Sequence, residues 1–147
     1  MSRLIVAAIV VGADDTILAS QRAYPESLRG LFEFPGGKLE DGETPRAALV
    51  RELREELSVE VDLGPTLPNP DREDGLWPIL AGRDMWTAWA RLAPRHTPRL
   101  TDSHLAHVWQ PRAALADLPW LPPDLPIARH IAATPPPTWT PRHYADN

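Results

Sequence analysis

The sequence predicts an α+β fold, an α/β/α sandwich around a mixed central sheet, and three observations support this. The chain has 147 residues, which is the length of one domain. Short apolar runs rich in β-branched residues recur along it, with a few helical segments between them. These helical segments are too few and too irregularly spaced for a doubly wound sheet, in which strands and helices alternate.

Three strands are predicted in the N-terminal part of the chain. The run Leu4–Val11 is short and apolar, as in a strand that is buried on both faces. Gly12-Ala-Asp-Asp15 is a hairpin-turn signal, and Thr16–Arg22 follows it as a second strand. A third short strand, Leu31–Phe34, alternates briefly before Pro35-Gly36-Gly37 interrupts it.

The strongest helix signal runs from Thr44 to Leu57. Thr44 is a good N-cap, and Pro45 suits the first helical position because its missing N–H is not needed there. The residues that follow, ALVRELREEL, are strong helix formers. At about 100° per residue, one side of the helix is apolar and the adjacent side is acidic. The apolar side holds Leu49, Val50, Leu53 and Leu57, and the acidic side holds Glu52, Glu55 and Glu56.

Three further strands and two short helices are predicted in the remainder. The strands are Val59–Leu63, Met85–Leu92 and Ala106–Trp109, and the helices are Arg112–Ala116 and Pro126–Ala133. The 18 prolines concentrate in Gly64–Pro78 and after residue 119, where they favour loops. We therefore expect one domain over residues 1–134 and a proline-rich tail over residues 135–147.

Composition narrows the classes of function. Cysteine is absent from the sequence, which excludes disulfides and thiolate metal sites. The apolar N-terminal run is shorter than the roughly 18 residues of a membrane span and lacks a cleavage site, so we expect a cytoplasmic protein that does not enter membranes. The net charge of -5 argues against binding duplex nucleic acid but allows a small nucleotide substrate. A monomer and a homodimer both remain open.

The acidic side of the predicted helix indicates a metal site. Several carboxylates on one helix face repel one another, and this arrangement is reasonable if a divalent cation lies between them. Dense oxygen ligands suit Mg²⁺ or Mn²⁺, which bridge phosphate oxygens. The glycines at 36 and 37 would let backbone approach such a ligand closely. The alternative is a solvated acidic face paired with Arg46, Arg51 and Arg54.

The segment Gly37–Val59, GKLEDGETPRAALVRELREELSV, resembles the Nudix box, G-x5-E-x7-R-E-U-x-E-E-x-G-U, in which U is aliphatic. The matching positions are Gly37, Glu43, Arg51, Glu52, Leu53, Glu55, Glu56 and Val59. Ser58 departs from the pattern, because it stands where the family has a glycine that can adopt a positive φ after the helix. Serine there would cost about 1 kcal/mol and touch no ligand.

The resemblance implies the Nudix fold, with a mixed central sheet and a catalytic loop-helix-loop. It implies that Mg²⁺, or Mn²⁺ in its place, is bound by Glu52, Glu56 and the Gly37 carbonyl. Glu55 would be a further ligand or would orient the base. Arg51 and Glu43 would support the site structurally, with the planar guanidinium orienting the carboxylates. Glu52 is the leading candidate for the base that activates water.

The stretch Gly30–Lys38, GLFEFPGGK, is similar to the MutT-like branch of the family, which hydrolyses nucleoside triphosphates to monophosphates and pyrophosphate. This similarity implies that Arg22 helps to hold the nucleotide and that the Phe34 backbone lines the base pocket. The segment Trp120–Pro126 looks like one found in MutT and CTP-pyrophosphohydrolase-like members, and it would place Asp124 against the base. Ionised Asp124 would accept from the cytosine amine, and protonated Asp124 could donate to an oxidised purine. The alternative for Asp124 is a loop aspartate or a helix cap.

Two assignments and two rival functions stay open. Arg83 stands where related enzymes place a substrate-contacting arginine, but it could also be a solvated residue at a strand end. The family often adds a metal carboxylate six residues before a late tryptophan, and here that position is Ser103, flanked by Asp102 and His104. Either Asp102 substitutes or the ligand is absent; imidazoles such as His104 and His107 suit a Mg²⁺ site poorly. The rival functions are hydrolysis of another nucleoside diphosphate derivative, such as ADP-ribose, and a catalytically impaired binding domain.

Overall fold

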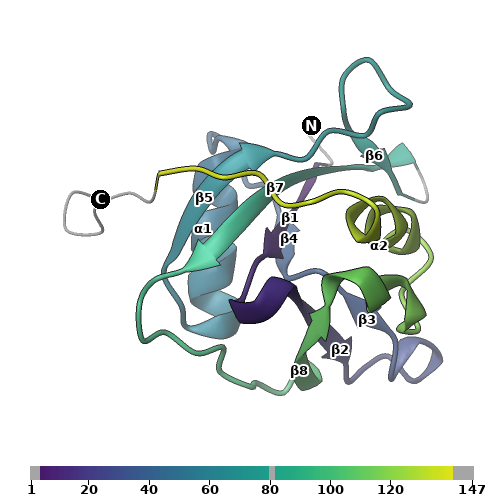
Figure 1. Ribbon diagram of the computed structural model, residues 1–147. Helices are drawn as coiled ribbons and strands as arrows, with labels where there is room; N and C mark the ends of the chain where they lie inside the picture. Colours follow the sequence, from purple (N-terminus) through teal and green to yellow (C-terminus); the bar gives the residue numbers. More distant parts are fainter. Residues whose placement is uncertain (1–3, 80–81, 141–147) are drawn as a thin grey trace.

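The computed structural model describes residues 4–79 and 82–140, and its larger sheet is mixed, as predicted. Four strands follow one another across this sheet in the order β4-β1-β7-β5, and β6 adds to β7 (Figure 1). Strands β1 and β7 are parallel, whereas the other pairs are antiparallel. The strands are β1 (Ile5–Val10), β4 (Gly36–Lys38), β5 (Val61–Thr66), β6 (Trp77–Pro78) and β7 (Asp84–Leu92).

A second, antiparallel sheet has the order β3-β2-β8, from β3 (Phe32–Glu33), β2 (Thr16–Arg22) and β8 (His104–Pro111). The predicted hairpin between the first two strands is wrong. The turn exists as the 3-10 helix η1 (Ala13–Asp15), but β1 and β2 share only the bridge between Val11 and Ile17 before they enter different sheets. The reason is that both edges of β1 are occupied by β4 and β7.

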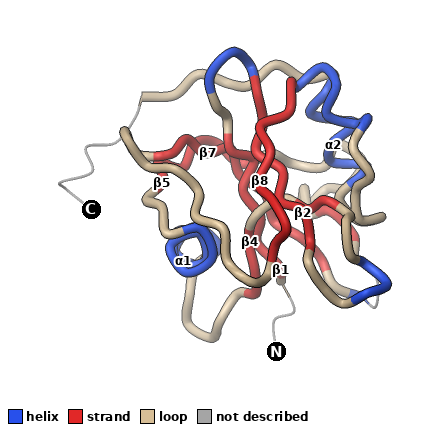
Figure 2. The backbone as a smooth tube through the Cα atoms, turned by 90° about the horizontal axis from the view of Figure 1, so that it is seen from below, coloured by secondary structure: helices blue, strands red, loops and turns tan. Residues whose placement is uncertain are grey.

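Helix α1 (Pro45–Leu57) has the bounds that its caps predict. The Thr44 hydroxyl accepts a hydrogen bond from the Ala47 N–H at 3.1 Å, which satisfies one unpaired donor of the first turn. Leu49, Leu53 and Leu57 are fully buried against one face of the larger sheet, together with Leu18 from the smaller one. The tube view of Figure 2 shows α1 standing apart from α2 on the other side of the strands.

A second apolar cluster fills the opposite face of the larger sheet. Helix α2 (Leu125–Ala132) and the 3-10 helices η2 (Glu26–Leu28) and η4 (Arg112–Asp117) belong to that side of the molecule (Figure 1). Ile127 and Ile131 of α2 are fully buried in this cluster. The sandwich therefore has helical layers on both sides of its strands, and no helix within residues 4–79 and 82–140 has the length and apolarity to cross a bilayer.

Several predicted boundaries need correction. The strand expected at Val59–Leu63 starts two residues later and ends at Thr66, and the one expected at Ala106–Trp109 runs from His104 to Pro111. The glycine stretch expected as a loop contains β4, which pairs with β1. The predicted helix Arg112–Ala116 is a 3-10 helix. Each difference arises from pairing with a neighbouring strand or from packing, which a local pattern does not contain.

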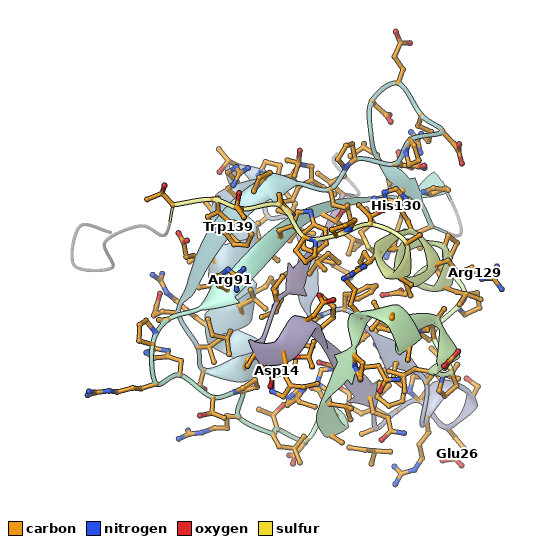
Figure 3. The ribbon with its side chains drawn as sticks, viewed as in Figure 1. Asp14, Glu26, Arg91, Arg129, His130 and Trp139 are labelled. Carbon is orange, nitrogen blue, oxygen red and sulfur yellow. The ribbon has the colours of Figure 1, made fainter. Side chains whose placement is uncertain are left out.

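The described part of the proline-rich tail has neither helix nor strand, as expected, but it is anchored. In Figure 1 it crosses over β7 and β5. The Trp139 Nε1–H donates to Asp62 Oδ2 at 2.8 Å, and the Arg91 guanidinium lies 5.0 Å from the indole ring (Figure 3). A side chain at Gly64 would collide with this indole. Residues 141–147 of the predicted tail lie outside the described residues.

Candidate active site

The glycine strand β4 brings backbone against the first carboxylate of α1. A Cβ atom added to Gly37 would lie 2.5 Å from Glu52 Oε1, which is closer than non-bonded atoms approach. Gly37 pairs with Val6 of β1, so its position is fixed by the sheet and not by a loose loop. The Glu52 side chain is only 13% exposed. Two of the residues that sequence predicts as metal ligands are therefore adjacent.

Arg51 forms hydrogen bonds with three carboxylates on or just before α1. Its Nε and Nη2 atoms donate to the two oxygens of Glu43 at 2.8 and 2.9 Å, and Nη1 donates to Glu52 at 3.1 Å and Glu55 at 3.2 Å. Nη2 also reaches the Lys38 carbonyl at 3.1 Å. The hydrogen bond from Arg51 lowers the pKa of Glu43, which keeps that carboxylate ionised. This planar fork fixes the geometry of the acidic face.

Burial makes Glu52 and Glu56, the inner carboxylates of the acidic face, harder to ionise. Burial raises the pKa of Glu56 to about 7; His104 opposes this shift, and the carboxylates of Glu33 and Glu52 add to it. Burial also raises the pKa of Glu52, and its hydrogen bond from Arg51 only partly offsets this. Two carboxylates that are difficult to ionise, beside a glycine backbone, fit a hard divalent cation that bridges them.

The outer half of the acidic face differs from the predicted ligand set. The Glu55 side chain is 59% exposed and is bonded to Arg51. Within residues 4–79 and 82–140, three or more metal-ligating side chains do not converge on one point. The structure thus brings Gly37 and Glu52 together, leaves Glu56 within range of the Glu52 charge, and leaves Glu55 at the rim. A shared ligand set that includes Glu55 would require its side chain to leave Arg51.

A charged row on the smaller sheet lies beside Glu56. Arg22 Nη1 is 3.0 Å from Glu33 Oε1, and His104 Nε2 is 2.8 Å from Glu33 Oε2. Sequence reasoning missed Glu33, although the alternation of Leu31–Phe34 contained the signal. Phe32 and Phe34 are buried in the apolar cluster, so Glu33 between them points to the opposite face of the strand.

The residues predicted to recognise the base also meet. Asp124 Oδ2 accepts a hydrogen bond from the Phe34 N–H at 3.0 Å, and the Phe34 ring stacks on Trp120 with 4.4 Å between centroids. Burial raises the pKa of Asp124 to about 7, because the side chain is only 4% exposed. Asp124 precedes α2 but its side chain forms no capping hydrogen bond, so the capping alternative is wrong.

Comparison with known proteins identifies the family. Residues 1–131 match the model of the NUDIX domain. The chain belongs to the Nudix family. Among its Nudix relatives, the CTP pyrophosphohydrolase of Escherichia coli (strain K12) is 36% identical over 134 residues, which are 90% of this chain and 94% of that protein. The 8-oxo-dGTP diphosphatase of the same organism is 36% identical over 88 residues, which cover 56% of this chain and 68% of that one.

Solved Nudix structures agree with this assignment. The E. coli ORF135 protein has a TM-score of 0.68 and 34% identity, over 88% of each chain. The MutT protein of methicillin-resistant Staphylococcus aureus 252 has a TM-score of 0.64 and 32% identity, over 90% of this chain and 98% of that one. The predicted family and fold class are therefore confirmed.

The Nudix ligand expected before the late tryptophan is either Asp102 or absent, and the Asp102 side chain forms no hydrogen bond or ion pair with the other residues that the structure describes. Asp102 is exposed in a turn, and the Ser103 carbonyl accepts a hydrogen bond from the Ala23 N–H at 3.0 Å. The charged groups with the largest effect on Glu56 include His104 but neither of these residues. The structure thus favours the alternative in which that carboxylate is absent.

Arg83 is not part of the site network in this structure. It lies half-buried just before β7, and its carbonyl accepts a hydrogen bond from the Ile79 N–H at 2.8 Å. Its side chain forms no hydrogen bond or ion pair with the other residues that the structure describes. A contact between Arg83 and substrate stays a prediction.

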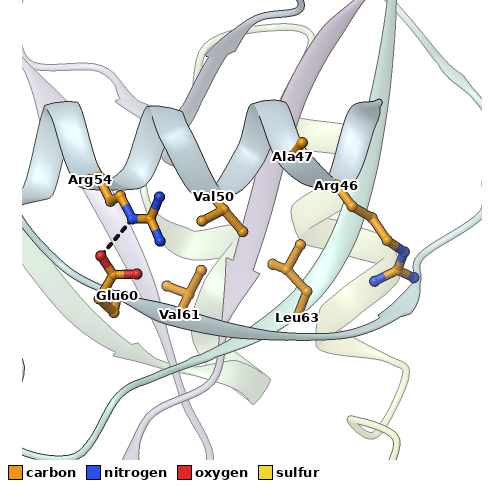
Figure 4. Close-up of a pocket in the computed structure, with 7 residues that line it drawn as sticks. All are labelled: Arg46, Ala47, Val50, Arg54, Glu60, Val61 and Leu63. Carbon is orange, nitrogen blue, oxygen red and sulfur yellow. Dashed lines mark hydrogen bonds and ion pairs between the residues drawn. The ribbon is translucent and has the colours of Figure 1, made fainter. Parts of the chain in front are cut away.

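A cavity beside α1 is separate from this chemistry. It has a volume of about 400 Å³ and lies between α1 and β5, lined by residues that include Arg46, Val50 and Arg54 (Figure 4). At about 100° per residue, these positions lie on the side of α1 opposite Glu52 and Glu56. Catalysis is therefore assigned to the carboxylate side of the helix and not to the cavity.

Proposed function

We propose that this Nudix protein is a metal-dependent nucleoside triphosphate pyrophosphohydrolase that produces a nucleoside monophosphate and pyrophosphate. The observation that carries the proposal is the position of the Glu52 carboxylate, which lies against Gly37 and whose charge acts on the half-buried Glu56. Glu52, Glu56 and the Gly37 carbonyl would hold Mg²⁺, with Mn²⁺ as a substitute. When bound, the cation neutralises phosphate charge and lowers the pKa of coordinated water.

The protein's own groups would position the reactants. Arg51 and Glu43 hold the acidic face in place, since the guanidinium fork engages both Glu43 oxygens at 2.8 and 2.9 Å. The attacking water must lose a proton, and the carboxylates of Glu52 and Glu56 are the acceptors nearest to where it would bind. Burial raises the pKa of Glu56 to about 7, which suits proton acceptance near neutral pH, and burial also raises the pKa of Glu52. Arg22 would contact the phosphates of the substrate.

Phe34 and Asp124 would select the base. Asp124 has a pKa of about 7, so both its protonated and ionised forms are accessible near neutral pH. The ionised form accepts hydrogen bonds, as an exocyclic cytosine amine requires, and the protonated form can donate one to an oxidised purine. The relatives named CTP pyrophosphohydrolase and 8-oxo-dGTP diphosphatase support both substrate classes.

Chromatographic identification of the products across a panel of nucleotides tests the proposal, with a nucleoside monophosphate and pyrophosphate expected from each triphosphate. The panel contains CTP, dCTP, 5-methyl-dCTP, dGTP, 8-oxo-dGTP and ADP-ribose, each with Mg²⁺, Mn²⁺ or EDTA. We expect triphosphates to be cleaved only with the cation. Glu52→Gln and Glu56→Gln should each reduce kcat by orders of magnitude with an unchanged circular dichroism spectrum.

Glu60→Gln is the matched control, because Glu60 pairs with Arg54 on the other side of the helix. Its activity should equal that of the wild type. Near-normal activity in both Glu52→Gln and Glu56→Gln would overturn the proposal. Faster cleavage of ADP-ribose than of any triphosphate would overturn the substrate class alone.

A further inference from the structure

Glu56 lies in the last turn of α1, where a helix has carbonyl groups without partners of its own. The helix ends at Leu57, and the last four carbonyls of a helix lack an intrahelical donor. The Ser58 N–H satisfies one of them, the Arg54 carbonyl, at 3.1 Å. Ser58 does so with a φ of 57°, a left-handed conformation that costs a residue with a side chain about 1 kcal/mol. The last turn therefore depends on partners from outside the helix.

The segment 93–103, which connects β7 to β8, supplies such partners (Figure 1). The Arg99 N–H donates to the Leu57 carbonyl, the last one of the helix, at 2.8 Å. Just beyond the helix, the Glu60 N–H donates to Nδ1 of His96 at 2.9 Å. The connecting segment is thus bonded to the end of α1 and to the residues that follow it.

His107 of β8 holds this segment from the other side. Its Nε2 atom lies 3.3 Å from the Arg99 carbonyl, and because a carbonyl only accepts hydrogen bonds, the ring carries a proton on Nε2. Nδ1 then accepts from the hydroxyl of Ser20, a fully buried residue of β2, at 2.9 Å. Burial lowers the pKa of His107, which favours this neutral ring. Both ring nitrogens are therefore bonded, and the orientation of the ring is fixed.

We propose that His107 is a positioning residue for Glu56, on which it acts through the backbone of Arg99 and the end of α1. The inference rests on the proposed function, in which Glu56 holds the cation. A continuous chain of hydrogen bonds runs from Ser20 through His107 and Arg99 to the last carbonyl of the helix. Without this chain the last turn would fray, and Glu56 would shift relative to Glu52, one turn earlier in the helix. A displacement of about 1 Å in a site lowers the rate by up to about 100-fold.

Two substitutions separate the two bonds of the ring. His107→Asn keeps an amide near Nδ1 for Ser20 but does not reach the Arg99 carbonyl. His107→Gln keeps an N–H near the place of Nε2, so it can still donate to that carbonyl. Gln110→Ala is the matched control, because Gln110 lies on the same strand and also donates to a backbone carbonyl, that of Ala114, at 3.0 Å. Its register with β2 places it on the opposite face of the sheet from His107.

The readouts are kcat and KM with saturating Mg²⁺, Mn²⁺ affinity by electron paramagnetic resonance, and hydrogen exchange of the Arg99 amide. We expect His107→Asn to lower kcat and Mn²⁺ affinity by about 10-fold each, with little change in KM. The Arg99 amide should exchange about 10-fold faster in the same variant. His107→Gln should recover most of each loss, and Gln110→Ala should match the wild type. Wild-type kcat and Mn²⁺ affinity in His107→Asn, or an equal loss in Gln110→Ala, would overturn the inference.

Ser58→Gly tests whether the effect passes through the end of the helix. Glycine strengthens this end independently of the connecting segment, so Ser58→Gly combined with His107→Asn should regain about 3-fold in kcat over His107→Asn alone. The stabilised double variant also keeps the test available if His107→Asn folds poorly. No recovery in the double variant would overturn the inference, because the loss would then not arise at the last turn of α1.

Glu56→Gln distinguishes this inference from the proposed function. If Glu56→Gln abolishes Mn²⁺ binding while His107→Asn leaves both kcat and Mn²⁺ affinity unchanged, only the role of His107 fails. If Glu56→Gln keeps the kcat and the Mn²⁺ affinity of the wild type, the proposed function fails and the role of His107 fails with it.

Discussion

Replacing Gly37 by alanine should impair catalysis without unfolding the protein. The new methyl group would lie 2.5 Å from Glu52 Oε1 and closer still to Oε2 and Cδ, whereas ordinary contacts are about 3.5 Å, so the carboxylate must move by about 1 Å or more. A displacement of this size in a site costs roughly 100-fold in rate, or about 3 kcal/mol of activation free energy. The fold should lose less than about 1 kcal/mol, because the carboxylate ends a flexible side chain and Gly37 does not have a positive φ.

Gly36→Ala is the contrasting variant. A methyl group at Gly36 would overlap backbone, with Ala7 Cα and the Val6 carbonyl carbon both at 2.8 Å, and paired strands cannot move aside. We expect it to cost about 3 kcal/mol or more of unfolding free energy. Urea unfolding, kcat and Mn²⁺ affinity should be measured for both variants. Full activity of Gly37→Ala, or instability equal to that of Gly36→Ala, would refute the assigned contact between Gly37 and Glu52.

Two further predictions concern stability. Ser58 ends α1 with a φ of 57°, a backbone conformation that glycine adopts without strain. Ser58→Gly should therefore stabilise the fold by roughly 0.5–1 kcal/mol and raise Tm by about 2–4 °C with unchanged activity. A lower Tm would contradict this prediction. Trp139→Ala removes the hydrogen bond to Asp62 and the contact with Arg91, and should cost roughly 2–3 kcal/mol in urea unfolding. Trp139→Phe should cost about half as much, and wild-type stability of Trp139→Ala would show that the tail does not need this anchor.

The sequence predicts best those features that depend on neighbouring residues. The limits of α1 follow from Thr44, which caps the first turn, and from Ser58, whose left-handed φ matches the glycine position of the motif. The apolar and acidic sides of the helix follow from its period. These signals lie within a few residues of the feature that they predict.

Features that depend on distant residues were not predictable in the same way. Glu33 and His104 are 71 residues apart in sequence, and they meet because β3 and β8 flank β2. Trp139 and Asp62, 77 residues apart, form the anchor of the tail. The hairpin signal at Gly12 was locally sound, but β1 already had a neighbour on each edge. Strand pairing is decided by the whole chain, so local patterns could not contain it.

The buried Asp124 predicts how stability depends on pH. Burial raises its pKa from 3.8 to about 7, so the folded protein binds this proton more tightly than the unfolded chain does. The stabilisation is complete below about pH 4 and is lost as pH rises through 7. A shift of about 3 units corresponds to at most about 4 kcal/mol. Asp124→Asn removes this titration, and its amide oxygen can still accept from the Phe34 N–H.

We therefore expect Asp124→Asn to equal the wild type in unfolding free energy near pH 4 and to exceed it by up to about 4 kcal/mol at pH 8. Glu56 contributes with the same sign, because burial raises its pKa to about 7. Saturating Mg²⁺ separates the two groups. Mg²⁺ should remove the contribution of Glu56 to the pH dependence of the unfolding free energy, because a cation binds the ionised carboxylate, and it should leave the contribution of Asp124 unchanged. Urea titrations from pH 4 to pH 8 measure both. Parallel curves for wild type and Asp124→Asn would show that Asp124 ionises as easily in the folded protein as in water.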